Sequence, residues 1–267
     1  MVTLARGQLM RCPALMPSNG TRGHPLWRFD RQRLRSTEAP GIVGVDEAGR
    51  GALAGPVVAA AAFLSNSAYE ESSFRRHSRA INDSKQLSPE ERDAQFVLIE
   101  SWRIAGLVLV APGVASVEEI ESLNILGATR LAMQRALEAI DVALCPAGED
   151  AVDELIGSEM AASQFPLMLV DGKPLKPFPW AHTGVVGGDG KSLAIAMASI
   201  VAKVTRDRLM VELHQEDGRY GYNSHKGYGA PKHVQAIHAH GASVHHRSKF
   251  LRKLISDEPS AEQVELF

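Results

Sequence analysis

Two adjacent carboxylates, Asp46 and Glu47, stand directly after the apolar run Ile42–Val45, which predicts a short buried strand. Acidic side chains at the end of such a strand are costly unless a cation neutralises them. Because neighbouring side chains of a strand point to opposite faces, both could reach one ion only if the strand stopped there. Gly49 and Gly51 would allow the chain to turn at that point. A solvated acidic turn is the alternative for this pair taken alone.

The rest of the chain alternates strand-like and helix-like segments. Ser88 as N-cap, Pro89 at the first helical position and Glu91 three residues after the cap predict the start of one helix. Further helices are expected at 123–140, with an apolar stripe of Leu126, Met133, Leu137 and Ile140, and at 192–214 and 231–240. Expected strands cover 42–46, 56–63, 102–110, 167–171 and 183–186. This alternation favours an α/β fold around a mostly buried sheet.

The composition is that of a globular protein, with 45% hydrophobic and 22% charged residues. No apolar run approaches the roughly 20 residues of a membrane span, so no membrane association is expected. Cys12 and Cys145 have no CxxC partner, which gives no support to a disulfide framework or a zinc knuckle. We therefore expect a cytoplasmic protein in a reducing compartment.

Three parts are expected along the chain. Residues 1–40 hold seven arginines and lack sustained periodicity, which predicts a disordered leader; an organelle transit peptide is the alternative. Residues 41–255 form the main domain, in which the small, acidic stretch 147–163 is expected to be a surface insertion. Residues 256–267 are expected to be a flexible tail. Residues 203–253 hold ten basic and four acidic residues, a patch that would suit a nucleic-acid backbone.

Acidic residues also end two later strand-like runs. Asp171 follows Leu169-Val170, and Asp189 lies in the glycine-rich segment after 183–186. Sites in open α/β sheets form in the crevice at strand ends, so these side chains should converge with Asp46 and Glu47. All-oxygen ligation favours Mg²⁺ or Mn²⁺ over zinc. Two such ions about 4 Å apart would stabilise the attacking and leaving oxygens of a displacement at phosphorus.

Five sequence blocks resemble, in order, the signature blocks of ribonuclease HII, the bacterial type 2 ribonuclease H. They are Gly44–Gly51, Asn82–Ser88, Leu169–Gly172, Ala198–Asp207 and His225–Tyr228. The resemblance implies a ribonuclease H-like α/β fold, with a central five-stranded mixed sheet, flanking helices and further helices at the C-terminus. It implies a metal-dependent endoribonuclease that cuts the RNA strand of RNA–DNA hybrids. It also implies cleavage 5′ of single ribonucleotides in duplex DNA, leaving 5′-phosphate and 3′-hydroxyl ends.

The resemblance also implies roles for individual residues. Asp46, Glu47, Asp171 and Asp189 match the four carboxylates that hold two Mg²⁺ or Mn²⁺ ions. The loop Gly49-Arg50-Gly51 matches the one that grips the ribonucleotide, and Tyr228 the tyrosine that packs on its sugar. Three lysines are expected to meet phosphates: Lys85, Lys203 and Lys226. Gly187 departs from the pattern, since the family usually has lysine there.

For several other features, a purely structural interpretation stands beside the functional one. Lys203 and Asp207 are four residues apart on a helix and could form only a structural ion pair. Asp83 is interpreted as a turn cap rather than a fifth carboxylate ligand. The histidines of 225–246 are expected at the surface or beside phosphates rather than around zinc, and the segment around Gly190 is out of register for a phosphate-binding P-loop.

The last five residues, Gln263-Val264-Glu265-Leu266-Phe267, are similar to the short motif by which bacterial proteins dock on the replication sliding clamp. An incidental amphipathic tail is the alternative. For the activity itself two alternatives are kept: a type 3 ribonuclease H that acts only on longer hybrids, and a catalytically inactive protein that binds hybrids.

Overall fold

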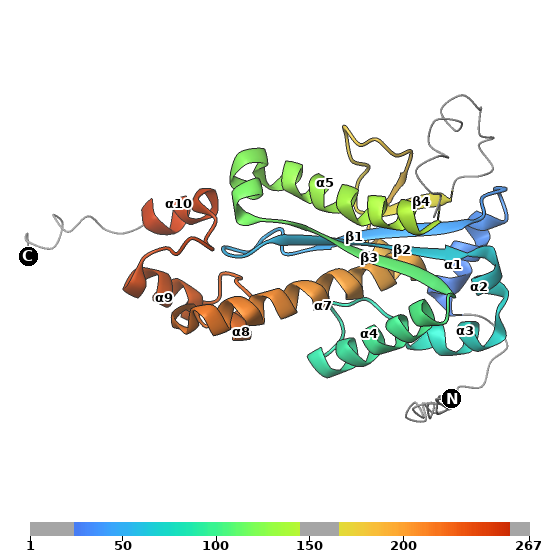
Figure 1. Ribbon diagram of the computed structural model, residues 1–267, viewed down its shortest axis with the longest axis horizontal. Coiled ribbons are helices and arrows are strands. Elements are labelled where there is room, and N and C mark those ends of the chain that lie inside the picture. Colours follow the sequence, from blue (N-terminus) through green and yellow to red (C-terminus); the bar gives the residue numbers. More distant parts are fainter. Residues whose placement is uncertain (1–23, 145–165, 257–267) are drawn as a thin grey trace, which may run out of the picture.

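A five-stranded mixed sheet forms the centre of the molecule in the computed structural model, which describes residues 24–144 and 166–256 (Figure 1). The strand order is β3-β2-β1-β4-β5, with the first three strands antiparallel and β1, β4 and β5 parallel. The strands are β1 (Gly41–Ala48), β2 (Val57–Ser65), β3 (Val108–Ala115), β4 (Leu167–Asp171) and β5 (Thr183–Val185). The expected mixed sheet of five strands is confirmed.

Helices flank this sheet and continue beyond it at the C-terminal end of the chain (Figure 1). In chain order they are α1 (Pro25–Leu34), α2 (Asn66–Glu70), α3 (Ser72–His77), α4 (Pro89–Ile104), α5 (Val117–Leu144), α7 (Leu193–Glu216), α8 (Tyr222–His225), α9 (Pro231–His240) and α10 (Ser248–Ser256). Short 3-10 turns are η1 (Ser78–Ala80), η4 (Gly188–Gly190) and η5 (Gly218–Tyr220). The capping box predicted at Ser88 and Glu91 is present at the start of α4.

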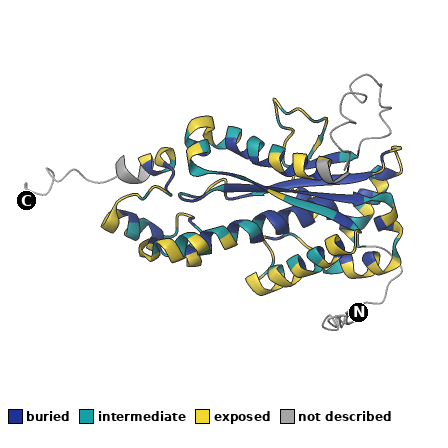
Figure 2. Ribbon diagram, in the orientation of Figure 1, coloured by how far each residue is buried: buried dark blue, intermediate teal, exposed yellow. Residues whose placement is uncertain are grey.

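The helices form two layers with the sheet between them. Helix α5 covers one face, while α7, together with α4 and α1, covers the other (Figure 1). Burial is concentrated in the strands and in α7, as Figure 2 shows. Residues 193–202 of α7 are all buried, as expected for a helix that is apolar on every side and lies inside the fold.

Helix α7 approaches strand β1 so closely that only glycine fits between them. A Cβ atom added to Gly44 would lie 2.2 Å from the carbonyl carbon of Ala194. Backbone contact of this kind fixes the separation and the register of the two elements, because no side chain is interposed. The acidic end of β1 is therefore held at a defined place along α7.

Residues of the expected leader belong to the folded domain, so the predicted boundary at residue 41 is wrong. Helix α1 buries Leu26, Asp30 and Leu34 against the core. The Asp30 carboxylate accepts hydrogen bonds from the Tyr69 hydroxyl (2.6 Å) and from the Ala194 amide (3.0 Å) at the start of α7. Burial raises the pKa of Asp30 to about 6 even though these hydrogen bonds lower it. The arginine-rich composition made this helix hard to predict: Arg28 is exposed, and Arg31 and Arg33 are half-buried.

Two other expectations are wrong in detail. Trp102 lies in α4 and not in a strand; the strand begins at Val108, since the glycine turn at Gly106 (φ 71°) separates helix from strand. Leu126 is 55% exposed, because helix α5 is interrupted at Asn124, where φ is 61°, and the stripe that packs begins after it. The insertion 147–163 and the tail from residue 257 lie outside the described residues. Within the described part, no helix is long and apolar enough to cross a bilayer.

Candidate metal centre and nucleic-acid interface

Three aspartates from separate parts of the chain meet at one end of the sheet. Strands β1 and β4 are parallel and pair Val45 with Val170, so the next residues, Asp46 and Asp171, lie at neighbouring strand positions. Asp189 arrives from η4, the turn that leads into α7. One carboxylate oxygen from each of the three lies within 4.8 Å of the others. The predicted convergence of Asp46, Asp171 and Asp189 is thus present in the fold.

Mutual repulsion and burial make this group of carboxylates unfavourable by itself. Asp46 is 3% exposed, and burial, followed by the charges of Glu47 and Asp171, raises its pKa well above the ordinary value. The Asp171 carboxylate accepts from the Gly188 amide at 2.6 Å, and the Asp189 carboxylate from the Gly190 amide at 3.0 Å. Oxygen-only donors in a concentrated negative field are what Mg²⁺ and Mn²⁺ require, so these residues fit a hard divalent cation.

Glu47 lies outside this group of three. Strand β1 continues through Ala48, so the predicted turn directly after Asp46 is wrong and the two acidic side chains leave opposite faces of the strand. The Glu47 carboxylate pairs with the Arg50 guanidinium at 2.9 Å. Burial raises the pKa of Glu47, while Arg50 acts in the opposite direction. Glu47 is nevertheless close enough for its charge to act on Asp46.

A lysine and two serines surround the three aspartates. The Lys85 ammonium lies 2.7 Å from Asp189, and this hydrogen bond raises the pKa of Lys85. On α7, the Ser199 hydroxyl hydrogen-bonds to Asp46 and lies 2.7 Å from the hydroxyl of Ser84. Nearby, Asp83 accepts from the Lys85 amide at 2.8 Å, so it caps the turn as predicted. The segment 82–88 is therefore tied to the acidic centre at both Ser84 and Lys85.

The loop after β1 contacts a second loop that follows α8. The amides of Leu53 and Ala54 donate to the Gly227 carbonyl at 2.8 and 3.2 Å. Gly49 has φ 92°, and a Cβ atom there would lie 1.9 Å from the Arg206 side chain, so only glycine is accommodated. At Gly51 an added Cβ would meet nothing within 4 Å. Backbone hydrogen bonds at Leu53 and Ala54 thus join the segment that follows the 49–51 loop to the loop that carries Tyr228.

Tyr228 and the two remaining lysines lie on this second loop and on α7. The Tyr228 ring is partly exposed. The Arg206 guanidinium lies against it, with its central carbon Cζ 5.2 Å from the centroid of the ring. Lys203 is 5.9 Å from the same centroid and pairs with Asp207 at 2.6 Å, so the structural ion pair is present. Lys226 adopts φ 52°, and its ammonium donates to the Asn223 carbonyl.

Three histidines form a network with the Tyr228 loop; His233 and His246 are buried and His225 is half-buried, so the expectation of surface histidines is wrong for His233 and His246. His233 donates Nδ1–H to the Tyr228 carbonyl (2.8 Å). His246 Nδ1 accepts from the Ser243 amide (2.9 Å), so its protonated Nε2 donates to His233 Nε2 (3.1 Å). His225 donates through Nε2 to Tyr220 and accepts at Nδ1 from Gly227. All three rings are therefore neutral in this network.

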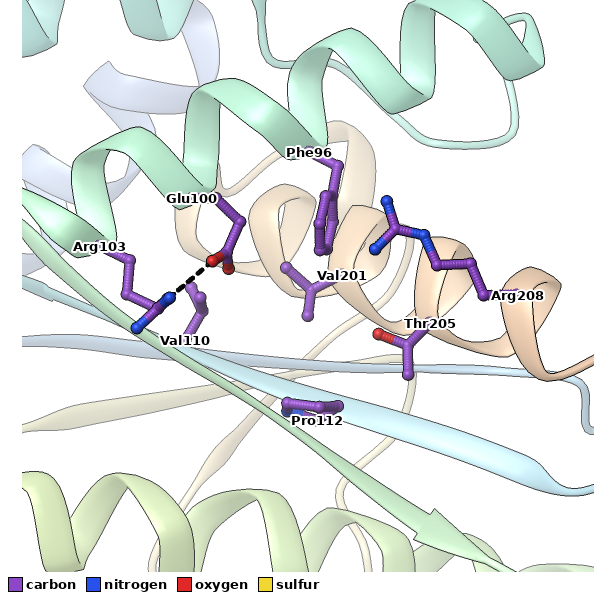
Figure 3. Close-up of a pocket in the computed structure, with 8 residues that line it drawn as sticks. All are labelled: Phe96, Glu100, Arg103, Val110, Pro112, Val201, Thr205 and Arg208. Carbon is purple, nitrogen blue, oxygen red and sulfur yellow. Dashed lines mark hydrogen bonds and ion pairs between the residues drawn. The ribbon is translucent and has the colours of Figure 1, made fainter.

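A separate pocket lies between α4, β3 and α7 (Figure 3). Its charged residues are already engaged: Arg103 pairs with Glu100 at 2.8 Å, and the Arg208 guanidinium lies over the Phe96 ring at 4.5 Å. None of the three clustered aspartates lines it. The pocket is therefore distinct from the acidic centre.

The fold places the chain in a structural class. Solved structures similar to it include the ribonuclease H2 from Pyrococcus horikoshii OT3, with a TM-score of 0.51, 21% identity and coverage of 81% of this chain and 97% of the other. Bst-RNase HIII in complex with Mn²⁺ matches with a TM-score of 0.57, 18% identity and coverage of 90% and 76%. At these identities the likeness is one of fold. The chain has the ribonuclease H-like fold, with an acidic centre at its strand ends.

Sequence comparison gives the family. The family model for ribonuclease HII matches residues 43–253. Ribonuclease HII of Burkholderia mallei (strain SAVP1) is 42% identical over 215 residues, which cover 80% of this chain and 85% of that protein. Ribonuclease HII of Wolbachia pipientis subsp. Culex pipiens is 41% identical, covering 81% and 93%. The chain belongs to the ribonuclease HII family, and it is therefore a metal-dependent enzyme with ribonuclease H activity.

Addition of Mg²⁺ or Mn²⁺ should stabilise the protein through the three aspartates. At an ion concentration a hundred times the dissociation constant, one bound ion adds about 2.7 kcal/mol, measured as a rise in the unfolding temperature. Asp46→Asn should remove most of this rise. In EDTA the same variant should unfold at a higher temperature than wild type, because one repelling charge is gone. Asp93→Asn, on the exposed side of α4, is the control and should keep the full metal response.

Acidification should destabilise the protein through its buried histidines. Burial lowers the pKa of His246 to about 4, and it also lowers the pKa of His233 and His225. Because the unfolded chain then binds protons more tightly, stability is fully present above about pH 6.5 and is lost as the pH falls toward 4. His246 alone should cost about 2 kcal/mol at pH 5.

Urea unfolding of His246→Gln and of wild type at pH 7 and pH 5 measures this effect. The difference between the two pH values should be smaller in the variant, whatever its absolute stability. His77→Gln, a change at an exposed position, should keep the wild-type difference. An unchanged pH dependence in His246→Gln would show that His246 does not carry it.

Proposed function

We propose that this enzyme cleaves duplex DNA on the 5′ side of single embedded ribonucleotides, as well as the RNA strand of RNA–DNA hybrids, leaving 5′-phosphate and 3′-hydroxyl ends. The proposal rests on one observation: Arg206 contacts both the 49–51 loop and the loop that carries Tyr228. Gly49 and Tyr228 both contact Arg206, and Gly49 is only three residues beyond Asp46. A ribonucleotide held by these loops would present its phosphate to the carboxylates.

Recognition of the ribonucleotide would rest on its 2′-hydroxyl, because that group alone distinguishes RNA from DNA at a given position. Gly51 leaves open space above the backbone, so a sugar-phosphate can approach the amides closely. The partly exposed Tyr228 ring offers a flat surface for the sugar. Arg50, already paired with Glu47, opposes the rise that burial causes in the pKa of that carboxyl group.

Asp46, Asp171 and Asp189, with Glu47 beside them, would hold two Mg²⁺ or Mn²⁺ ions, for which the solved Bst-RNase HIII complex with Mn²⁺ offers a parallel. Such ions lower the barrier by stabilising the charge on the entering and leaving oxygens at phosphorus. Lys85 neutralises Asp189, and its largely exposed side chain can turn toward a phosphate. Lys203 and Lys226 would contact the backbone of the duplex and position it without reading sequence.

Cleavage of two matched duplexes tests the proposal, one with a single ribonucleotide and one with four consecutive ribonucleotides. Wild type with Mg²⁺ or Mn²⁺ should cut both, at the 5′ side of the single ribonucleotide. Asp46→Asn should lower kcat by at least about a hundredfold, since a ligand that offsets transition-state charge is lost. Tyr228→Ala should reduce cleavage of the single-ribonucleotide duplex at least tenfold.

Other outcomes would select the alternatives. Cleavage confined to the four-ribonucleotide duplex would favour a type 3 activity. Binding of hybrids without cleavage, unaffected by Asp46→Asn, would favour a protein that has lost catalysis. Asp93→Asn serves again as the exposed acidic control and should retain wild-type rates.

A second part of the proposal concerns a partner: the C-terminal residues Gln263–Phe267 would dock on the replication sliding clamp. The sequence ends in Leu266-Phe267, which could fill an apolar pocket, and these residues lie outside the described structure. The solved PCNA:RNase HII complex from Archaeoglobus fulgidus has a TM-score of 0.50 and 20% identity to this chain, with coverage of 78% and 94%. In that organism, a ribonuclease HII thus forms a complex with PCNA.

Removal of residues 263–267 should abolish co-elution with the sliding clamp and leave the cleavage rate of free duplex unchanged. Leu266→Ala together with Phe267→Ala should have the same effect, because the apolar pair supplies the buried surface. Val264→Ala, which leaves that pair intact, is the matched control. Co-elution that survives the deletion would exclude this docking mode.

A further inference from the structure

Two arginine side chains, Arg206 and Arg247, are completely buried, with 0% exposure each. Burial of a charged group is expensive, and it is usually offset by a partner of opposite charge. Among the described residues, neither guanidinium has an ion-pair partner; each donates to backbone carbonyls instead. Burial, followed by the charge of Arg206, lowers the pKa of Arg247 to about 9. Such a costly arrangement calls for an explanation.

Arg247 binds the inner side of the 49–51 loop. Its Nη1 donates to the carbonyls of Gly49 (2.8 Å) and Arg50 (3.1 Å), and its other nitrogens hold Gly55. In a planar trans peptide the amide N–H points away from the carbonyl of the same unit. Because the carbonyls of Gly49 and Arg50 point inward to Arg247, the amides in the same peptide units, those of Arg50 and Gly51, point outward. Both residues are exposed, so these amides face the side from which a duplex would approach.

Arg206 joins this loop to the one that carries Tyr228. Its Nε and Nη2 donate to Pro56 (2.9 Å) and Ala54 (3.1 Å), in the segment that follows the 49–51 loop. Its Nη1 donates to the Lys226 carbonyl at 3.0 Å, and the Tyr228 ring lies over its guanidinium. One rigid fork of donors thus sets the distance between the two loops. A lysine offers no such fork.

We propose that Arg206 and Arg247 are positioning residues for ribonucleotide recognition: they direct the backbone amides of the 49–51 loop outward and hold Tyr228 at a fixed distance from them. Their unpaired charges also place positive potential beneath the site where a phosphate would lie. This inference rests on the proposed function, in which these two loops read the ribonucleotide. It assigns neither arginine a contact with the substrate.

The test uses Arg206→Lys and Arg247→Lys, which keep the charge and remove the fork. For the single-ribonucleotide duplex, kcat should fall at least tenfold while KM stays within about threefold, because misplacement of the reacting group affects the rate more than duplex binding. A uniform RNA–DNA hybrid offers many equivalent registers. The factor by which kcat falls should therefore be at least five times smaller for the hybrid than for the single-ribonucleotide duplex. The rise in unfolding temperature on adding Mn²⁺ should remain. Arg130→Lys is the matched control, since Arg130 also donates to backbone carbonyls, those of Lys176 and Pro177, on the exposed side of α5.

The outcomes separate this inference from the proposed function. If wild type does not cut the single-ribonucleotide duplex, the proposed function fails first. Suppose that wild type cuts this duplex. If kcat of both lysine variants then falls by the same factor on the two substrates, or falls on neither, only the positioning role is overturned. Failure of both variants to unfold cooperatively would likewise overturn it, because the arginines would then serve the fold as a whole.

Discussion

The parallel pairing of β1 with β4 is the constraint on which the acidic centre depends. It brings Asp46 and Asp171 to neighbouring positions at the same edge of the sheet, where their charges repel. The repulsion is tolerated because the surrounding packing fixes the positions of both residues. Backbone contact between Gly44 and α7 locks β1, and the Gly188 amide holds Asp171. The free energy of packing thus maintains a charge arrangement that a cation can then stabilise.

Helix α7 connects this centre with the two loops that we propose recognise the ribonucleotide. Its N-terminus follows Asp189, Ser199 reaches Asp46, and Arg206 reaches the loops at 49–51 and 226–228. Ser199 and Arg206 are seven residues apart, which is about 10 Å along a helix and close to two full turns. They therefore share a face of α7, and helix geometry sets the separation between the acidic centre and these loops. Helix α1 reinforces the same element, because its buried Asp30 caps the first turn of α7.

The parts that sequence predicted well are those with local causes. Apolar runs ending in acidic residues predicted the end of β4 and the three clustered aspartates, and Ser88 with Glu91 predicted the start of α4. Other features depend on contacts distant in the chain. Helix α1 is recognisable only through Asp30 meeting Tyr69 and Ala194, and the length of β1 depends on its pairing with β2. No local feature of the sequence predicted that β1 would continue past Asp46 and place the side chains of Asp46 and Glu47 on opposite faces of the strand.

Arg206 and Arg247 illustrate the limit most clearly, because arginine is almost always exposed or paired, and no spacing marks a buried one. Their proposed role depends on two neighbouring electrostatic fields of opposite sign, one from the carboxylates and one from the arginines. The carboxylates make one part of the surface attractive to cations. The guanidiniums, which have no ion-pair partner among the described residues, would make the neighbouring part attractive to phosphate. If the arginines were paired with carboxylates of the protein, that contrast would vanish. The three neutral histidines near Tyr228 are consistent with this, since His233 and His225 hydrogen-bond to its loop, and His246 to His233, without adding charge there.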